Sequence, residues 1–263
     1  MNHTEIATEV GKIAVEAGEL LRGFFRSDIH MEYKGVADIV TTADTTSERF
    51  IVERVTSLVP DAAVLAEEGG GTIHQEGLTW IIDPLDGTTN FAHGFPWFSV
   101  SIALVKGVIP QVGVIYHPIT RELFTAIRGN GALCNGKPIH SSHVKLLRHG
   151  LLTTGFYYFK GEELKRQIDV FEQVHQAVQT VRRPGSAAMD LAYVAGGFFD
   201  AFWEKGLSPW DIAAGILLVE EAGGTVTDYA GTPATVVSKE IAASNGQLHD
   251  ELLALLIYPT DHD

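Results

Sequence analysis

Two aspartates near the middle of the chain have the type and spacing of metal ligands. Asp83 and Asp86 follow the apolar run at residues 80–82, which predicts a short buried strand ending at Asp83. Pro84 restricts φ and turns the chain, so both carboxylates can face one point. Carboxylate oxygens are hard ligands that suit Mg²⁺, usually together with water and substrate phosphate. The segment predicts a magnesium site, although Asp-Pro and Asp-Gly are also common pairs in ordinary turns.

The residues after Asp86 have the character of an anion-binding turn. Gly87 lets another group approach the backbone closely, and a helix that began at Thr88 would present free N–H groups. Phosphoryl transfer depends mainly on positioning and charge neutralisation, so it needs cation ligands beside oxyanion donors. The segment at residues 83–90 therefore indicates phosphate chemistry.

Two further acidic positions have an ordinary structural explanation when taken alone. Asp211 lies three residues after Ser208, with Pro209 between them, and this spacing is typical of a helix capping box. Glu67 and Glu68 precede three glycines, and such a pair is commonly a solvated surface pair. The hypothesis of a metal site rests on these positions in combination with residues 83–86.

The elements that position these residues follow from hydrophobic periodicity. It predicts helices over residues 4–26, with Thr4 as the N-cap, and over 45–58, 162–178, 187–195 and 209–222. A loop or short hairpin joins the first two helices, and β-rich segments occupy 98–105, 108–116, 122–128, 151–154 and 199–202. We expect two α+β halves, 1–145 and 146–263, packed as one body.

Composition narrows the class of protein. The chain has 263 residues, 45% of them hydrophobic, and 19 Lys and Arg against 33 Asp and Glu, for a net charge of −14. This balance excludes disorder as the main state and argues against direct binding to nucleic acid or anionic membranes. The single cysteine, Cys134, excludes an intrachain disulfide. Without an apolar leader or membrane span, we expect a soluble cytoplasmic protein.

Two motifs make the chain resemble a known family. The sequence DPLDGTTNF at residues 83–91, the sequence WDIAAG at 210–215 and the acidic pair upstream are similar to those of the inositol monophosphatase family. That family comprises Mg²⁺-dependent, lithium-sensitive phosphatases, and the resemblance covers nearly the whole chain. It implies a layered α/β/α/β/α sandwich of the inositol monophosphatase and fructose-1,6-bisphosphatase type, usually as a homodimer, with two or three Mg²⁺ ions per subunit.

The resemblance also implies a metal-ligand set. Glu67, Asp83 and the backbone carbonyl of Leu85 would hold the first ion, and Asp83 would bridge to a second ion completed by Asp86 and Asp211. Residues 66–69 read Ala-Glu-Glu-Gly where family members often have Gly-Glu-Glu-Ser. Glu67 is preferred over Glu68 by alignment alone.

Other roles come from the same resemblance. The catalytic group would be Thr88 with Glu67 and Asp44, which orient the attacking water, while Lys34 belongs to a flap near a weaker third ion. Contacts to the substrate would come from both halves of the chain: Asp86, Gly87, Thr88, Gly185, Ser186, Ala187, Glu204 and Asp211. Glu204 could equally be a surface or hinge carboxylate.

The resulting hypothesis is a Mg²⁺-dependent phosphomonoesterase that hydrolyses a small polyol or sugar phosphate, with inositol monophosphate as first choice. Attack by metal-activated water needs no covalent phosphoenzyme. Alternative substrates are fructose 1,6-bisphosphate, histidinol phosphate, NADP and 3′-phosphoadenosine nucleotides. A different alternative is a non-enzymatic partner protein that retains the fold and binds RNA or the transcription machinery, which the intact metal set and the negative charge disfavour.

Several other residues invite a functional interpretation. Arg182 and Arg183 could attract phosphate, but a dimer contact or a solvated pair is equally consistent with them. His140 and His143 lie in a polar loop without a third ligand, which favours solvated side chains over a zinc site. Cys134 has no neighbouring activating group, and we expect an inert thiol.

Overall fold

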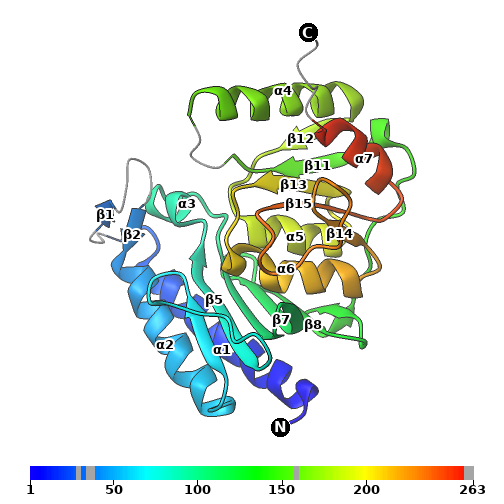
Figure 1. Ribbon diagram of the computed structural model, residues 1–263. Helices are drawn as coiled ribbons and strands as arrows, with labels where there is room; N and C mark the ends of the chain where they lie inside the picture. Colours follow the sequence, from blue (N-terminus) through cyan, green and yellow to red (C-terminus); the bar gives the residue numbers. More distant parts are fainter. Residues whose placement is uncertain (28–30, 34–38, 157–159, 258–263) are drawn as a thin grey trace.

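The chain folds into five layers (Figure 1). The computed structural model describes residues 1–27, 31–33, 39–156 and 160–257. Helices α1 (His3–Phe24) and α2 (Thr42–Leu58) cover an eight-stranded sheet, and α5 (Ala187–Ala195) and α6 (Pro209–Glu221) separate it from a five-stranded sheet. Helices α4 (Glu162–Ala177) and α7 (His249–Leu256) cover the far face of the second sheet. The predicted α/β/α/β/α sandwich is confirmed.

The first sheet has the strand order β10-β9-β8-β7-β6-β5-β3-β4. Its pairs are antiparallel except for β3 with β5. The strands are β3 (Ala63–Ala66), β4 (Gly70–Gly71), β5 (Leu78–Asp86), β6 (Ser99–Lys106), β7 (Ile109–His117), β8 (Glu122–Ile127), β9 (Ala132–Cys134) and β10 (Lys137–Pro138). The turn at Asn135 and Gly136 joins the last two strands, which pair as an antiparallel hairpin.

The second sheet has the order β12-β11-β13-β15-β14, and β11 runs parallel to both of its neighbours. Its strands are β11 (Leu151–Thr154), β12 (Thr180–Arg182), β13 (Ala201–Lys205), β14 (Thr225–Thr227) and β15 (Glu240–Ser244). A separate antiparallel pair, β1 (Met31–Tyr33) and β2 (Ile39–Thr41), forms the predicted hairpin between α1 and α2. The remaining elements are α3 (Thr88–Ala92) and a 3₁₀ turn, η1 (Leu147–His149).

Strand β5 does not end at Asp83 as predicted. It continues through Pro84 to Asp86, and its register against β6 shifts between Asp83 and Asp86. Asp83 pairs with Ser101 and Asp86 with Ser99, so three steps along β5 match two along β6. In a regular strand, residues three apart point to opposite faces; the extra residue of a bulge brings them to the same face. Pro84, which lacks an N–H, is tolerated at such an irregularity.

The starts of two helices also differ from the prediction. Helix α1 begins at His3, and Asn2 is its N-cap in place of Thr4, because Asn2 Oδ1 accepts from Glu5 N at 2.9 Å. Helix α2 begins at Thr42, and Thr41 is its N-cap. The described helices include none that is long and apolar enough to cross a membrane.

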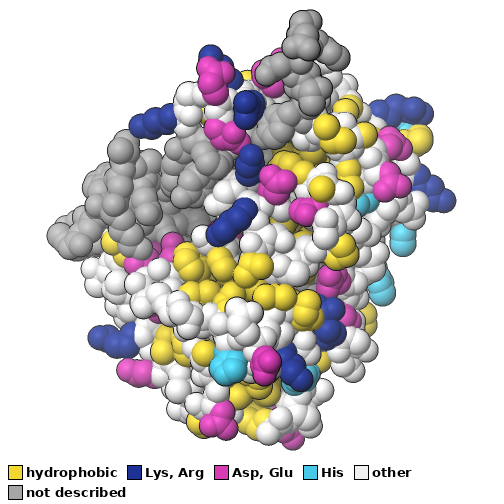
Figure 2. Space-filling view, viewed as in Figure 1, with side chains coloured by type: hydrophobic (Ala, Val, Ile, Leu, Met, Phe, Trp, Pro, Cys, Tyr) yellow, Lys and Arg dark blue, Asp and Glu magenta, His cyan; other side chains and the backbone are white. Residues whose placement is uncertain are grey.

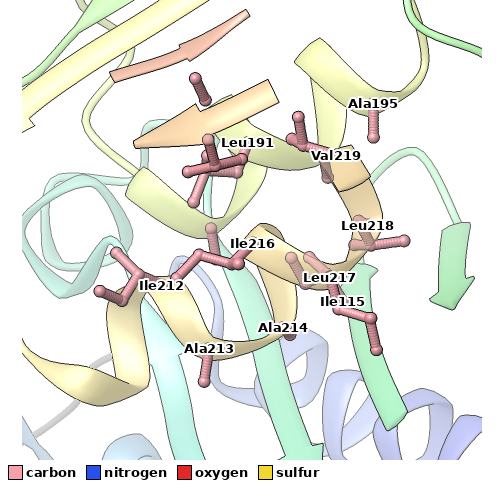
Figure 3. Packing of buried hydrophobic residues seen from close by; sticks show 14 of the residues in the cluster. Ile115, Leu191, Ala195, Ile212, Ala213, Ala214, Ile216, Leu217, Leu218 and Val219 are labelled. Carbon is pink, nitrogen blue, oxygen red and sulfur yellow. The ribbon is translucent and has the colours of Figure 1, made fainter. Parts of the chain in front are cut away.

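The middle helices join the two sheets through one hydrophobic cluster (Figure 3). Ile212 and Ile216 of α6 and Leu191 of α5 belong to it, together with Ile115 of β7. Gly113 of β7 allows α6 to lie close, because a Cβ there would be 2.9 Å from the carbonyl oxygen of Ala214. This packing places the N-terminus of α6 at the end of β5. The domain division at residues 145 and 146 stays a prediction.

Candidate metal and phosphate site

Two buried carboxylates and a half-buried one meet where β5 ends and α6 begins. Asp83, Asp86 and Asp211 each offer an oxygen, and these atoms lie within 4.8 Å of one another. The side chains of Asp83 and Asp86 are 2% and 8% exposed. Across the described residues, no other group of three His, Cys, Asp or Glu side chains converges in this way. An all-oxygen donor set of this charge fits Mg²⁺.

Burial raises the pKa of each member of this acidic cluster, and the charges of neighbouring carboxylates raise it further at Asp83 and Asp211. Burial, followed by the charges of Glu67, Asp86 and Asp211, raises the pKa of Asp83 well above its usual value. Burial and then the Asp86 charge raise the pKa of Asp211 to about 7. The pKa of Asp86 rises to about 6 through burial, which hydrogen bonds from Ser186 and α5 amides partly offset. The cluster therefore needs protons or cations to offset its charge.

Asp86 connects the metal side of the site to helix α5. Its Oδ2 accepts hydrogen bonds from Ser186 Oγ at 2.5 Å and from Ala188 N at 2.8 Å. Gly185 precedes this contact with a φ of +91°, a conformation that favours glycine. The predicted substrate residues at 185–187 thus lie beside the acidic cluster.

Asp211 has the structural role that its sequence pattern indicated and also lies in the acidic cluster. Its Oδ2 accepts from Ser208 N at 2.6 Å and closes the capping box at the start of α6. The same carboxylate lies beside Asp83 and Asp86. A cap and a candidate metal ligand are therefore compatible at this position.

The turn after Asp86 has the form expected of an anion-binding loop. Gly87 adopts a left-handed φ of +97°, and α3 begins immediately afterwards at Thr88. A Cβ at position 87 would be 3.0 Å from the carbonyl oxygen of Trp97 and 3.3 Å from that of Gly185. Glycine is required here by both conformation and space. The sequence expectation of a helix starting at Thr88 is confirmed.

Thr88 and Asp44 form a second polar group at this turn. Thr88 Oγ1 lies 3.0 Å from Asp44 Oδ1 and 3.0 Å from the carbonyl oxygen of Leu85. Asp44 Oδ2 accepts from Thr41 N at 2.8 Å and Thr41 Oγ1 at 2.5 Å, so it also caps α2. Burial raises the pKa of Asp44. The backbone carbonyl of Leu85, which is a predicted metal ligand, therefore faces the Thr88 hydroxyl.

A cavity of about 430 Å³ brings most of the predicted site residues together. Asp83 and Leu85 lie buried beneath it, and Asp44 lies behind Thr88. Lys34 lies outside the described residues. The cavity is lined by Glu67, Asp86, Gly87, Thr88, Thr89, Asn90, Gly155, Phe156, Arg183, Gly185, Ser186, Ala187, Glu204, Gly206, Leu207, Ser208, Trp210 and Asp211.

Glu204 lines one wall of this cavity, so it is neither a surface nor a hinge carboxylate. It lies within β13, a strand that begins at Ala201, two residues later than the predicted start. Burial, followed by the charges of Asp211 and Asp86, raises the pKa of Glu204 to about 8. Gly155 makes room for this side chain, because a Cβ at 155 would overlap the Glu204 carboxylate.

Sequence reasoning missed the role of Asn90. Its Nδ2 donates to the carbonyl oxygens of Trp97 at 2.8 Å, Pro184 at 2.9 Å and Gly185 at 3.2 Å. Asn90 thus ties the anion-binding turn to the substrate loop, which is some ninety residues later in the chain. Its position inside the DPLDGTTNF motif was the available signal.

The remaining candidates lie away from the cavity. His140 and His143 are exposed, which agrees with the expectation of solvated imidazoles, and His93, just after α3, is exposed as well. Cys134 is half-buried, and burial raises the pKa of its thiol, as expected of an unreactive cysteine. None of the three histidines belongs to the described acidic cluster.

Comparison with known proteins agrees with this geometry. A model of the inositol monophosphatase family matches residues 2–258. The chain is 44% identical to the inositol-1-monophosphatase of Synechocystis over 94% of its length and 86% of the relative. It is 42% identical to the Nus factor SuhB of Pseudomonas aeruginosa over 93% of each chain. The crystal structure of the extragenic suppressor protein suhB from Bartonella henselae superposes with a TM-score of 0.90 at 39% identity, covering 96% of this chain and 98% of that one. The chain therefore belongs to the inositol monophosphatase family.

Proposed function

We propose that this protein is a Mg²⁺-dependent phosphomonoesterase acting on small polyol or sugar phosphates, with inositol monophosphate as the preferred substrate. The observation that carries this proposal is the meeting of Asp83, Asp86 and Asp211 beside the turn at Gly87. Cation ligands and an oxyanion-binding turn share one cavity, as phosphate-ester hydrolysis requires. Membership of the family supports this class of chemistry.

The acidic cluster and its neighbours supply the ligands for two ions. Glu67, Asp83 and the Leu85 carbonyl would hold one ion, and Asp83, Asp86 and Asp211 the other, with a weaker third ion near Asp44. When bound, the ions would neutralise the phosphate oxygens and make water easier to deprotonate. Because carboxylates repel a phosphate, cations must bind before substrate or together with it.

Thr88 orients the water that attacks phosphorus. The hydrogen bond from Thr88 Oγ1 to Asp44 directs the hydroxyl proton away from the cavity, so the oxygen can accept a hydrogen bond from water. Glu67 is the second acceptor that fixes this water. The backbone N–H groups of Gly87 and Thr88 donate hydrogen bonds to the phosphate oxygens. These bonds keep the phosphorus in line for attack.

The other wall of the cavity binds the alcohol. Glu204 accepts hydrogen bonds from ring hydroxyls, and Gly185, Ser186 and Ala187 contact the same part of the substrate. A polyol offers several hydroxyls to this wall. Inositol monophosphate therefore fits the site better than a simple alkyl phosphate.

Phosphate release from a substrate panel tests the proposal. The panel comprises inositol 1-phosphate, fructose 1,6-bisphosphate, histidinol phosphate, NADP and 3′-phosphoadenosine 5′-phosphate, each with Mg²⁺ and with EDTA. Asp86→Asn should abolish release, while Asp169→Asn, on the exposed face of α4, should leave it unchanged. Activity that persists in EDTA or in Asp86→Asn contradicts the proposal. Lithium sensitivity is a further prediction, tested by titrating LiCl into the same assay.

We also propose a homodimer. Phe95 and Phe198 are large apolar side chains that are 51% and 54% accessible. Tyr193 lies 4.9 Å from Trp97 and 4.7 Å from Phe198 between ring centroids. An apolar face of this kind is stabilised by a second copy of the chain. Sedimentation should give a dimer that Phe198→Ser weakens and Ile168→Ser, equally exposed on α4, does not.

A second candidate function is contact with other proteins, which the name Nus factor SuhB suggests for one relative. On the face drawn in Figure 2, Lys and Arg side chains are interspersed with Asp and Glu, which favours protein contacts over direct contact with RNA. Asp83→Asn separates the two functions: loss of phosphatase activity with retained binding to the transcription machinery would support this candidate. If Asp83→Asn retained both the phosphatase activity and the binding, the proposed enzyme would be contradicted.

A further inference from the structure

The alcohol wall of the cavity is built at one edge of the second sheet. Strands β12, β11 and β13 are adjacent and parallel, so their carboxyl ends lie at the same edge. Phe156 follows β11 and Arg183 follows β12, while Glu204 belongs to the last part of β13. Ligands of α/β proteins commonly bind beyond the carboxyl ends of parallel strands.

Arg183 is a cation in an otherwise acidic and neutral cavity. Within the described part of the chain, no other Lys or Arg lines this space, whereas Glu67, Asp86, Glu204 and Asp211 do. The Arg183 charge also lowers the pKa of Glu204, so the two groups are within electrostatic range. An anionic group of the substrate that lies away from the candidate metal ions is therefore attracted to Arg183.

Phe156 orients the Arg183 side chain. Arg183 Nη2 donates to the Phe156 carbonyl oxygen at 3.3 Å, and Cζ lies 5.9 Å from the centroid of the Phe156 ring. No carboxylate of the described residues lies within ion-pair distance of Arg183. A guanidinium carries five N–H donors, and among the described residues the Phe156 carbonyl alone accepts a hydrogen bond from Arg183.

Arg182 provides a contrast in the same segment. Its Nη1 donates to Thr180 Oγ1 at 3.0 Å and to the carbonyl oxygen of Val181 at 3.3 Å. Arg182 does not line the cavity. Two adjacent arginines with the same charge thus have different surroundings. Arg182 can therefore serve as a control that distinguishes a specific contact of Arg183 from a general attraction of anions.

We infer that Arg183, held against Phe156, binds a second phosphate at the end of the substrate away from the scissile phosphate. Polyol and sugar bisphosphates then join the proposed monophosphate substrates, and their intervening hydroxyls contact Glu204. A guanidinium fork matches two phosphate oxygens, and such charge-assisted pairs are stronger than bonds to a neutral hydroxyl. This inference rests on the proposed phosphatase activity and names a specificity-determining residue for it.

The experiment compares substrates that differ by the second phosphate alone. We would measure kcat/KM with Mg²⁺ for fructose 1-phosphate and fructose 1,6-bisphosphate, and for inositol 1-phosphate and inositol 1,4-bisphosphate. Arg183→Gln should lower the bisphosphate-to-monophosphate ratio about tenfold in at least one pair, in keeping with the loss of a charge-assisted bond. Arg183→Lys should retain part of the ratio, because an ammonium keeps the charge without the fork. Arg182→Gln should leave the ratio and the activity unchanged.

The outcomes distinguish the two proposals. Hydrolysis of all four substrates with an unchanged ratio in a folded Arg183→Gln protein, verified by circular dichroism, overturns the role of Arg183 alone. An equal fall of the ratio in Arg182→Gln also overturns it, because general electrostatic attraction would then suffice. Failure of the wild-type protein to release phosphate from any of the four overturns the proposed function together with this inference.

Discussion

The hydroxyl of Thr88 lies 3.0 Å from a carboxylate oxygen of Asp44, which caps the start of α2. This hydrogen bond links the first helix layer to the anion-binding turn, across 44 residues of sequence. Thr88→Val keeps the shape of the side chain and removes the hydroxyl. We expect kcat to fall by about 10²-fold, the usual contribution of a positioned proton-transfer group. Thr88→Ser should recover most of the activity, and equal losses in both variants would contradict the role of the hydroxyl.

The raised pKa values predict how stability depends on pH without metal. The pKa of Asp86, Asp211 and Glu204 rises in the folded state to about 6, 7 and 8. Each group therefore stabilises the fold below its unfolded pKa, and this stabilisation is lost as pH rises through the folded value. In EDTA, the thermal midpoint should fall from about pH 4, near the unfolded carboxyl pKa values, to about pH 8, the folded value of Glu204. A midpoint that rises over this range would contradict the assignment.

Mg²⁺ should reverse this dependence. Bound cations favour the charged carboxylates, so the increase in thermal midpoint on adding Mg²⁺ should be larger at pH 8 than at pH 6. Asp86→Asn should reduce the increase at both values. Na⁺ at matched ionic strength provides the control for general screening. An increase that is independent of pH would place the ion elsewhere.

Gly155 predicts a specific effect on substrate binding. A Cβ at this position overlaps the Glu204 carboxylate, so Gly155→Ala should displace Glu204 from the alcohol wall. We expect KM for inositol 1-phosphate to rise about tenfold, or about 1.4 kcal/mol, which is within the range for the loss of one hydrogen bond. Gly23→Ala in α1 is the matched control, because a Cβ there meets no atom within 4 Å. An unchanged KM in Gly155→Ala would exclude Glu204 from substrate binding.

Gly215 makes a prediction about the middle layer. A Cβ at this position would overlap the Leu191 side chain, where α6 packs against α5. Gly215→Ala should destabilise the fold by about 1–3 kcal/mol, the typical effect of overpacking a core. Urea unfolding measures this change. Leu191→Ala alone should destabilise the fold by about 2–5 kcal/mol, because it leaves a cavity, but the space it opens should make the double variant less destabilised than the sum of the two single variants. Strictly additive losses would contradict the packing explanation.

Local sequence patterns predicted most of the helices and strands whose bounds depend on residues nearby in the chain. Helix α5 at Ala187–Ala195 and strand β11 at Leu151–Thr154 have the predicted bounds, because their periodicity and their flanking residues suffice. The site motif at residues 83–91 identified the phosphate turn through its glycine and its acidic residues. Burial of the flanking strand followed from its apolar side chains.

Features that depend on distant partners could not be predicted in this way. The continuation of β5 through Pro84 depends on the register with β6, which no local pattern contains. Two of the three hydrogen bonds of Asn90 depend on a loop from the second sheet. Glu204 was ambiguous for the same reason, since the room for its side chain is left by Gly155, just after the neighbouring strand β11.

The acids of this site share a feature with consequences for its evolution. Asp44 and Asp211 cap helices α2 and α6, and Asp86 accepts a hydrogen bond from a backbone amide in the first turn of α5. Three helix dipoles thus direct their positive ends at one negative cluster. An amide oxygen can accept the same bonds, so replacement by asparagine keeps the helix starts while removing the ligand charge. A lineage could therefore silence catalysis by single-base changes and keep an intact scaffold for other uses, whereas alanine at the same positions would damage the scaffold.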